Sequence, residues 1–331
     1  REEYEAHAKG ICPAKKCREL IQYVINDNCT GCTKCFQECP VNAIGFKPYE
    51  KHELDQQLCI KCDNCRVVCP ENAVEIVIGA EDTHKTLDTL ASVWQALSEK
   101  GASRHSLLIN VGGGMVTDLG GFAAATFKRG IAYINIPTTL LAMVDASVGG
   151  KTGINFNGLK NEIGSFFPAS SVLIETEFLR SLDRYNFLSG YAEMLKHGLI
   201  STPAHWSELL TFNTEHIDYS ELKQLVGRSV QVKEDIVQQD PFEHGIRKAL
   251  NLGHTVGHAF ESLALAENRH VLHGYAVAWG VVCELYLSNV KAGFPTDKMR
   301  QTIQFIKENY GTFFIDCKTY DRLYEYMLHD K

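Results

Sequence analysis

The chain has 331 residues, enough for two or three domains, and its apolar fraction of 45% is typical of a globular protein. Its 40 acidic residues outnumber the 33 basic ones, and no basic run exceeds two residues, which argues against nucleic acid as the main partner. No stretch approaches the ~20 uninterrupted apolar residues of a membrane span, and the charged first residues do not resemble a signal peptide.

Ten of the twelve cysteines lie between Cys12 and Cys69, and eight of them form two copies of one motif. The motif, C-x2-C-x2-C-x3-C followed by proline, spans Cys29–Cys39 and Cys59–Cys69, an internal duplication with a period of about thirty residues. Clustered thiolates at tight spacing suit metal or cluster ligation better than disulfides. We therefore expect a reducing, cytoplasmic environment.

The spacing is typical of ferredoxins with two 4Fe–4S clusters, in which the fourth cysteine of each run ligates the cluster of the other run. One predicted ligand set is Cys29, Cys32, Cys35 and Cys69. The other predicted set is Cys39, Cys59, Cys62 and Cys65. A zinc site or free thiols would be the alternative, but two complete copies that each keep the proline favour clusters.

Upstream of these runs, His7, Cys12 and Cys17 are either three ligands of a small zinc site or a metal-free cysteine pair at a helix start. From about Tyr4 to Val77, including CPAKKCREL and both cysteine runs, the sequence resembles the C-terminal tail of the flavin-bearing, NADH-binding subunits of bacterial hydrogenases and related dehydrogenases. The resemblance implies that residues 1–77 form an α+β, ferredoxin-like domain with an electron-transfer partner.

Beyond residue 78, apolar periodicity predicts alternating helices and strands. Helical spacing covers 85–97, 120–127 and 138–148, and short apolar runs at 106–111 and 131–137 indicate strands. This alternation predicts a parallel α/β nucleotide-binding layer over residues 78–178. From 179 to 331 the strand signals fade, and amphipathic stretches at 221–237 and 246–264 predict an all-helical domain. The chain is thus expected to be multidomain.

Two polar constellations lie in the predicted α/β layer. Gly112–Gly114 follow a strand, where glycines let the backbone approach a pyrophosphate at a helix N-terminus. This is not the G-x-G-x-x-G spacing of the Rossmann fingerprint, and it could mark only a tight turn. Hydroxyls and charges suited to a polyol or a phosphate follow at Thr138, Thr139, Asp145, Lys151 and Lys160. A loop with solvated lysines is the alternative.

A third constellation has the composition of a catalytic metal site. His254 and His258 are spaced i, i+4, so one helix face presents both imidazoles. His273 opens a later helical stretch, and Glu193 is followed by Lys196 on the same face. A glutamate and two histidines with an open position are typical of catalytic zinc, whereas an isolated H-x3-H is more often a packing feature.

From about Gly79 to Lys331 the chain resembles the 3-dehydroquinate synthase family. The motifs GGGMVTD, FKRG, IPTTLLAMVDASVGGKTGIN, GLKN, GYAEMLKHG and RKALNLGHTVGHAFE occur in the family's order. The resemblance implies a lyase of the shikimate pathway that uses NAD catalytically together with zinc or cobalt. Its substrate would be 3-deoxy-D-arabino-heptulosonate 7-phosphate, which is oxidised, loses phosphate, is reduced again and closes to a carbocycle.

The same resemblance assigns roles to single residues. The implied metal ligands are Glu193, His254 and His273. The implied catalytic and substrate-pocket residues are Asp145, Lys151, Lys196, Glu243, Arg247, Asn251 and His258. Arg129 matches an arginine supplied by the neighbouring subunit, which implies a homodimer. The implied NAD contacts are Lys85, Gly113, Gly114, Asp118, Thr138, Thr139, Lys151, Lys160, Phe178 and Ser181.

The chain also departs from that family. Ferredoxin-like sequence occupies the place of the family's βα units before Gly79, and the family continues beyond the position of Lys331. Two incomplete modules thus meet near Val77 without a flexible linker, which suggests a chimera or a fragment. Two other functions stay open: an electron-transfer protein with an inert synthase part, and a related cyclitol synthase. Lysines and Arg247 suit a phosphorylated acid and count against a glycerol dehydrogenase.

Overall fold

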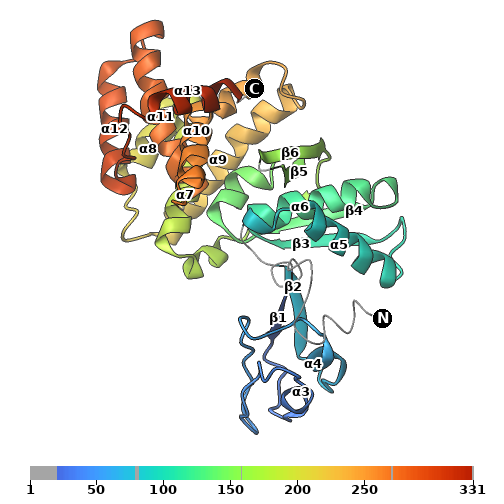
Figure 1. The fold of residues 1–331 in the computed structure, drawn as a ribbon. Coiled ribbons are helices and arrows are strands. Elements are labelled where there is room, and N and C mark those ends of the chain that lie inside the picture. Colours follow the sequence, from blue (N-terminus) through green and yellow to red (C-terminus); the bar gives the residue numbers. More distant parts are fainter. Residues whose placement is uncertain (1–20, 79–81, 158, 270, 330–331) are drawn as a thin grey trace. The chain divides into compact units, whose positions relative to one another are not determined.

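The computed structural model describes residues 21–78, 82–157, 159–269 and 271–329 (Figure 1). The chain divides into two compact units, Arg1–Ala96 and Leu97–Lys331, and each is described by itself. None of the helices in the described ranges is long and apolar enough to cross a membrane. The candidate zinc ligands His7, Cys12 and Cys17 lie outside the described residues.

Residues 21–78 of the first unit form a two-stranded antiparallel sheet with two single-turn helices. Strand β1 (Ile21–Ile25) pairs with β2 (Val74–Ile78), and both cysteine runs lie in the chain between them. Helix α3 (Lys34–Gln37) falls inside the first run and α4 (Asn64–Val67) inside the second. This α+β arrangement confirms the ferredoxin-like fold predicted for the cysteine-rich segment.

The internal duplication is visible in the backbone of this unit. Thr33 and Asp63 precede the two short helices, and both adopt left-handed backbone with φ of 63° and 68°. The fourth cysteine of each run accepts a hydrogen bond at Sγ from a backbone N–H four residues later, with N···S distances of 3.2 Å at both Ala43 and Ala73. The two halves therefore place their cysteines in equivalent surroundings.

Later in the chain, helix α5 (Leu87–Glu99) confirms the helix predicted over 85–97. In the second unit, β3 (Leu107–Gly112), β4 (Ala132–Pro137) and β7 (Ser171–Val172) form a parallel sheet in the order β3-β4-β7. Helix α6 (Gly114–Thr126) connects β3 to β4 and packs against both. The predicted parallel α/β layer is confirmed.

Two stretches of this layer differ from the prediction. The helix expected over 138–148 is largely a π-helical segment at Ala142–Ala146. Beyond it, β5 (Lys151–Phe156) and β6 (Leu159–Phe166) form an antiparallel hairpin that the sequence did not indicate. The hairpin lacks strand-like alternation because three successive residues of β5, Thr152 to Ile154, are buried.

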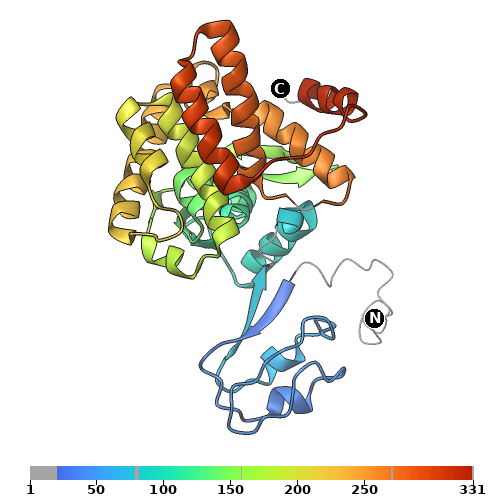
Figure 2. The same cartoon turned by 90° about the vertical axis from the view of Figure 1, so that its left-hand side faces the viewer.

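The rest of the second unit is helical, as predicted. Its long helices are α7 (Arg184–Ile200), α8 (Pro203–Thr211), α9 (Tyr219–Gln239), α10 (His254–Ala266), α11 (His273–Ala292), α12 (Thr296–Tyr310) and α13 (Tyr320–His329). Figure 2 shows the helices coloured yellow to red gathered into one bundle. Every residue of α7 from Phe187 to Gly198 is buried, so this helix forms the centre of the bundle.

The amphipathic stretch 246–264 is not one continuous helix. A 3-10 segment at Ile246–Asn251 is followed by a break, and α10 begins only at His254. Gly253 caps α10 with a φ of 83°, a conformation that disfavours a side chain. A Cβ at this position would lie 2.5 Å from Cγ2 of Val281 on α11. The break therefore lets α10 start in close contact with α11.

Candidate metal centres and active site

Three helices bring the predicted metal ligands together. Glu193 lies in the buried part of α7, His254 is the first residue of α10, and His273 is the first residue of α11. The Nε2 atoms of His254 and His273 lie 3.6 and 3.5 Å from Oε1 of Glu193. Ligands bound at about 2.0–2.1 Å in a tetrahedron are about 3.4 Å apart. Both distances from Glu193 are therefore compatible with a shared zinc-type site.

His258 lies one turn after His254 on α10 and adjoins the same group. Its ring centroid is 5.3 Å from that of His254 and 5.8 Å from that of His273. Ring nitrogens of the three histidines lie within 4.8 Å of one another, so the geometry also permits a three-histidine set. Glu193 favours the first set, because this buried carboxylate has Oε1 beside both His254 and His273, while Lys196 pairs with Oε2. Such a carboxylate needs cations around it.

The surrounding charges set the protonation of these ligands. Burial alone would raise the pKa of Glu193, but Lys196, His254 and His273 outweigh it and hold the pKa well below its usual range. Burial lowers the pKa of His254 to about 3, which keeps the imidazole neutral, as ligation requires. At His273 burial is outweighed by Glu261 and Glu193, which raise its pKa to about 10. A metal ion must therefore displace a proton from His273.

Glu261 is a member of this site that the sequence did not single out. It lies on α10, and its Oε2 is 3.3 Å from Nδ1 of His273, on the opposite side of the ring from Glu193. Its other oxygen accepts a hydrogen bond from Nζ of Lys160 at 2.8 Å. The available signal was its position seven residues after His254, which is two turns along the same helix face.

Four of the predicted pocket residues lie beside one another. Lys151 forms an ion pair with Glu243, and Glu243 accepts a hydrogen bond from Nδ2 of Asn251 at 2.8 Å. Arg247 is buried, and its guanidinium donates to the carbonyl oxygens of Gly149 at 2.9 Å and Pro241 at 2.6 Å. Two of the five donors of Arg247 are thus committed to backbone, which fixes the direction of the remaining ones.

Asp145 and Lys196 connect this pocket to the metal ligands. Asp145 accepts a hydrogen bond at 2.6 Å from Nζ of Lys233 on α9, a buried lysine that the sequence analysis missed. Burial raises the pKa of Asp145, but Lys233 and Lys196 outweigh it and keep the carboxyl ionised. Lys196 forms an ion pair with Glu193. Burial alone would lower the pKa of Lys196, but Glu193 and Asp145 outweigh burial and raise this pKa.

Four residues that follow β4 in the chain make these polar contacts to the helical part. We call these four residues the joint residues. Their partners on the helical side are Lys233, Arg247, Glu243 and Glu261. The joint residues are Asp145, Gly149, Lys151 and Lys160. The candidate site thus lies where the α/β layer meets the helical bundle.

Three of the predicted nucleotide contacts, Gly113, Thr138 and Thr139, lie at the carboxyl end of the parallel sheet. Gly112 and Pro137 end the neighbouring strands β3 and β4, and N–H of Thr138 donates to the carbonyl oxygen of Gly112 at 2.9 Å. A Cβ at Gly113 would lie 3.2 Å from Cγ2 of Thr139, so the glycine turn and this threonine touch. Nucleotides commonly bind at this edge of a parallel sheet, next to a helix N-terminus.

The remaining predicted nucleotide contacts are distributed over several elements. Gly114 and Asp118 lie one turn apart in α6. Phe178 and Ser181 are exposed in the 3-10 segment Thr176–Ser181, before α7. Lys85 is buried in the first unit.

Arg129 is exposed just beyond the last residue of α6, whereas the glycine turn lies at the first. The 13 residues of α6 separate the two by roughly 20 Å along the helix axis at 1.5 Å per residue.

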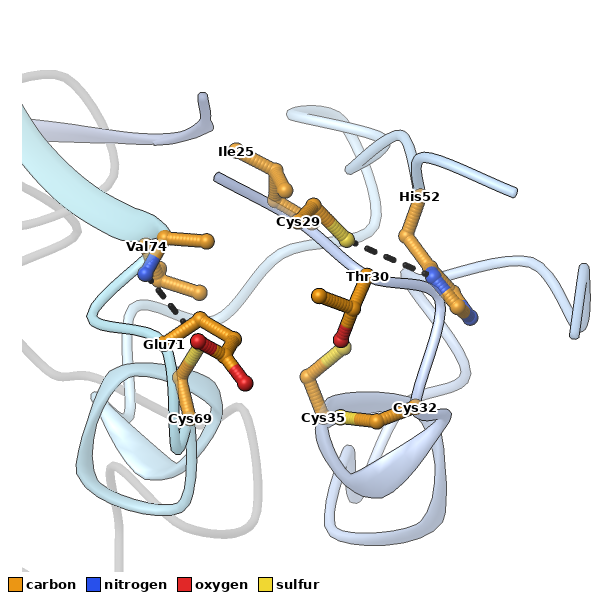
Figure 3. Close-up of a pocket in the computed structure, with 10 residues that line it drawn as sticks. Ile25, Cys29, Thr30, Cys32, Cys35, His52, Cys69, Glu71 and Val74 are labelled. Carbon is orange, nitrogen blue, oxygen red and sulfur yellow. Dashed lines mark hydrogen bonds between the residues drawn. The ribbon is translucent and has the colours of Figure 1, made fainter. Parts of the chain in front are cut away.

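The eight cysteines of the two runs line two cavities in the first unit. One cavity is lined by Cys29, Cys32, Cys35 and Cys69 together with Ile25, Thr30, His52, Glu71, Ala73 and Val74 (Figure 3). The other is lined by Cys39, Cys59, Cys62 and Cys65 with mainly apolar neighbours. In each cavity the fourth cysteine of one run joins three cysteines of the other.

The cysteine groups do not have the spacing of a zinc site. Among the described residues, the groups whose ligand atoms all lie within 4.8 Å of one another contain no cysteine. A single zinc ion with Zn–S bonds of about 2.3 Å would hold its sulfurs closer than this. Burial and neighbouring thiols raise the pKa of Cys65 to about 12, so thiolates form here only with a compensating cation. Wide spacing and apolar walls fit 4Fe–4S clusters.

His52 is another residue that the sequence analysis did not single out. It is buried, and its Nδ1 lies 3.8 Å from Sγ of Cys29 at the edge of the first cavity (Figure 3). The second cavity is lined by Tyr23 and Asp63 but, among the described residues, by no histidine. The two cavities, although related by the duplication, therefore offer different polar surroundings.

Comparison with known families divides the chain in a similar way. Residues 28–73 match the model of a 4Fe–4S dicluster domain. Residues 75–189 match the N-terminal domain of 3-dehydroquinate synthase, and residues 190–331 match its C-terminal domain.

Several curated proteins are similar in sequence. A 3-dehydroquinate synthase of Parabacteroides distasonis is 60% identical over 261 residues, which cover 79% of this chain and 74% of that one. The synthase of Streptococcus pyogenes serotype M3 is 41% identical over 233 residues, 70% of this chain and 64% of that one. That of Pyrococcus furiosus is 42% identical over 224 residues, 68% of this chain and 65% of that one. The chain thus spans less than two thirds of the latter two relatives.

Two solved structures share the fold of the second unit at moderate sequence identity. One is 2-deoxy-scyllo-inosose synthase complexed with carbaglucose-6-phosphate, NAD+ and Co2+, with a TM-score of 0.67 and 26% identity, covering 76% of this chain and 69% of that one. The other is the 2-epi-5-epi-valiolone synthase of Streptomyces hygroscopicus subsp. jinggangensis with NAD+ and Zn2+, with a TM-score of 0.58 and 26% identity, covering 76% and 81%.

Proposed function

Because the chain belongs to the 3-dehydroquinate synthase family, we propose that it converts 3-deoxy-D-arabino-heptulosonate 7-phosphate to 3-dehydroquinate and phosphate. This would make it a phosphorus–oxygen lyase of the shikimate pathway. The observation that carries the proposal is the convergence of Glu193, His254 and His273 beside a pocket of ion-paired lysines. A substrate with both a phosphate and a carboxylate needs such cations.

The proposed cofactors of this reaction are NAD and one divalent metal ion, zinc or cobalt. Solved relatives bind NAD+ together with Co2+ or Zn2+. The ligands would be Glu193, His254 and His273, whose donor set and spacing fit such an ion. The metal would polarise the substrate oxygen at the carbon that NAD oxidises and later reduces.

Within the protein, the proposed roles follow from charge and position. Lys196 stays protonated between Glu193 and Asp145, so it can stabilise negative charge that develops on the substrate. Lys151 and Arg247 would hold the phosphate and the carboxylate, with Glu243 and Asn251 fixing their positions. His258 adjoins the metal group and would transfer protons.

We propose that the nucleotide lies across the carboxyl end of β3 and β4. The N-terminus of α6 has no side-chain cap among the described residues, so its N–H groups can meet a pyrophosphate next to Gly113 and Gly114. The other proposed contacts are Lys85, Asp118, Thr138, Thr139, Lys151, Lys160, Phe178 and Ser181. The proposed division of the chain remains 1–77, 78–178 and 179–331.

The proposed homodimer rests on Arg129. This residue is exposed, and α6 separates it from the glycine turn of its own chain by roughly 20 Å. An arginine so placed is suited to reach a neighbouring subunit rather than its own nucleotide turn. Its role at the site of a second copy is therefore part of the proposal.

A second function, electron transfer, is favoured by the two cysteine-lined cavities. We propose 4Fe–4S clusters ligated by Cys29, Cys32, Cys35 and Cys69 and by Cys39, Cys59, Cys62 and Cys65. The synthase reaction returns every electron that it takes, so the clusters would serve a separate redox partner. Free thiols ready for cluster assembly agree with a reducing, cytoplasmic location.

A cyclitol synthase is the remaining alternative for the second unit, because the two solved relatives described above are an inosose synthase and a valiolone synthase. Sequence identity favours the dehydroquinate reaction, since it is 60% with a curated dehydroquinate synthase and 26% with the inosose synthase.

The test is phosphate release by the chain purified anaerobically, with NAD, zinc and the heptulosonate phosphate. We expect release by the wild type and a loss on the order of 10²–10³-fold in Glu193→Gln, which keeps the shape but removes the charge. Glu234→Gln, on the exposed side of α9, is the matched control and should behave as the wild type. Equal release by Glu193→Gln would contradict the proposed metal site, and release from glucose 6-phosphate instead would favour the cyclitol alternative.

A further inference from the structure

A row of three side chains leads from the hairpin of the α/β layer to the metal ligands. Lys160 belongs to β6, Glu261 to α10, and His273 opens α11. Glu261 uses one oxygen for each neighbour: Oε1 lies 2.8 Å from Nζ of Lys160, and Oε2 lies 3.3 Å from Nδ1 of His273. The imidazole of His273 is thus held between two carboxylates, Glu261 at Nδ1 and Glu193 at Nε2.

The burial of Glu261 shows that this arrangement is specific. The residue is only 8% exposed, whereas Lys160 beside it retains 45% of its side-chain exposure. A carboxylate so buried is costly unless cations or donors face both oxygens. Both oxygens of Glu261 face such groups, Lys160 at Oε1 and His273 at Oε2. Glu261 is therefore a charged acceptor at the Nδ1 side of the ring.

The consequence concerns the tautomer of His273. If Nδ1 donates its hydrogen to Glu261, Nε2 is left with its lone pair directed toward Glu193 and the candidate metal position. Carboxylates that hold the second nitrogen of a metal-binding histidine both orient the ring and make it a stronger donor. The opposite tautomer would present a hydrogen to the metal and place two lone pairs against each other at Glu261.

We propose that Glu261 is a positioning residue that presets His273 as a metal ligand, and that Lys160 holds Glu261 in place. The inference rests on the metal site of the proposed function and goes beyond it, because neither residue is among the ligands. It predicts a graded effect. Loss of the Glu261 charge acts directly on the ligand, whereas loss of Lys160 reaches the ligand only indirectly, by way of Glu261.

The test measures metal affinity and metal geometry rather than turnover. The full chain, with its cysteine sites filled by anaerobic cluster assembly, is freed of divalent metal at the second site. Zn2+ affinity is then measured by competition with a chromophoric chelator, and the visible absorption of bound Co2+ reports ligand geometry. Subtracting the signal of Glu193→Gln isolates the ion at this site from any binding elsewhere.

We expect Glu261→Gln to weaken Zn2+ binding by about 10- to 100-fold and to change the Co2+ spectrum. Glu261→Asp, which restores the charge on a shorter side chain, should recover part of the loss. Lys160→Met should weaken binding by a smaller factor. The matched control is Glu267→Gln, at the end of the same helix, where the carboxylate pairs instead with Arg269.

The outcomes distinguish a failure of this inference from a failure of the proposed function. Wild-type affinity and spectrum in Glu261→Gln, with normal metal binding by the wild type, would overturn the inference and leave the proposed function standing. A wild-type chain without an ion dependent on Glu193 would overturn the proposed metal site, and the inference with it. If Glu261→Gln does not fold by circular dichroism, the Lys160→Met and Glu261→Asp affinities decide, and wild-type values in both would also overturn it.

Discussion

Buried charges of alternating sign occupy the space between α7 and α9. Lys233 pairs with Asp145, Lys196 pairs with Glu193, and Lys196 also interacts with Asp145. Each pair survives burial because its partner offsets the cost of leaving water, and removing one member would leave an unpaired charge. Residues at this site are therefore coupled, so single substitutions will report on the network as well as on one side chain.

His205, away from this network, gives a pH prediction. It is buried in α8, its Nε2 lies 3.1 Å from Oγ of Ser229, and Glu208 and Arg228 are the charged groups nearby. Burial, followed by Arg228, lowers its pKa below the usual 6.5, and Glu208 offsets this only in part. Because the folded state binds the proton less readily than the unfolded state, this contribution to stability is complete above pH ~6.5 and is lost as the pH falls.

We expect His205→Gln to reduce the loss of unfolding free energy between pH 7 and pH 5, by at most about 1.4 kcal/mol for each pH unit below 6.5. Urea denaturation followed by helix circular dichroism at both pH values measures it. His216→Gln removes an exposed histidine as a control. An unchanged difference between the two pH values in His205→Gln would show that this imidazole is not a source of acid sensitivity.

At the scale of elements, the start of α10 determines where His254 can be. Gly253 adopts φ of 83°, and a Cβ there would lie 2.5 Å from Cγ2 of Val281 and 2.8 Å from the carbonyl oxygen of Val277. Any side chain must therefore push α10 away from α11. Since one metal ligand begins each of these helices, their contact sets the distance between His254 and His273.

We predict that Gly253→Ala lowers the free energy of unfolding by about 1–3 kcal/mol and weakens metal binding, because backbone strain and the clash both fall next to His254. Gly227→Ala is the matched control. Gly227 lies inside α9, and outside its own helix turn no described atom lies within 4 Å of the place that a Cβ would take, so alanine there should raise stability by about 0.5–1 kcal/mol. Denaturation and chelator competition on both variants test the pair, and equal effects would contradict the steric argument.

Elements with strong periodicity could be predicted from sequence, and contacts between elements could not. The strands at 106–111 and 131–137 and the helix at 221–237 appear within a few residues of their predicted bounds. The hairpin β5–β6 was missed because its burial does not alternate. The broken stretch 246–264 keeps helical periodicity on both sides of Gly253, so its pattern gave no sign of the break.

In the candidate site, too, residues with a local sequence pattern could be predicted, whereas residues that act through contacts between elements could not. His254 and His258 were recognisable because both lie on one helix at short spacing. Glu261 and Lys233 act through residues 12 and 88 positions away in sequence, and the only local signal is the position of Glu261 two turns after His254 on one helix face. Their roles depend on tertiary packing alone.

At the scale of the whole molecule, the first unit has a core of its own. Tyr23, Ile44 and Val74 pack with buried cysteines in a cluster that contains only residues of the cysteine-rich segment. The helical part of the second unit has a separate and larger core around α7. Because the two cores are separate, we expect that a substitution can remove the proposed clusters without removing the proposed synthase activity, and the reverse.

We therefore expect a double variant, Cys35→Ser with Cys65→Ser, to lose its iron while phosphate release stays at the wild-type rate. The physical reason is that the proposed reaction has no net electron demand. Iron content and phosphate release measured on the same preparation provide the test, with Cys283→Ser, a substitution in α11, as the control. A parallel loss of both would show that the clusters support the synthase.

The joint residues have a mechanical consequence. The links Asp145–Lys233, Lys151–Glu243 and Lys160–Glu261 are ionic, and two of them include partly exposed lysines. Dissolved ions screen such charges over about 8 Å at physiological ionic strength. Polyvalent anions would in addition compete for the same lysines. The contacts between the sheet layer and the helical bundle are therefore electrostatic, and we expect their strength to depend on the ionic composition of the solvent.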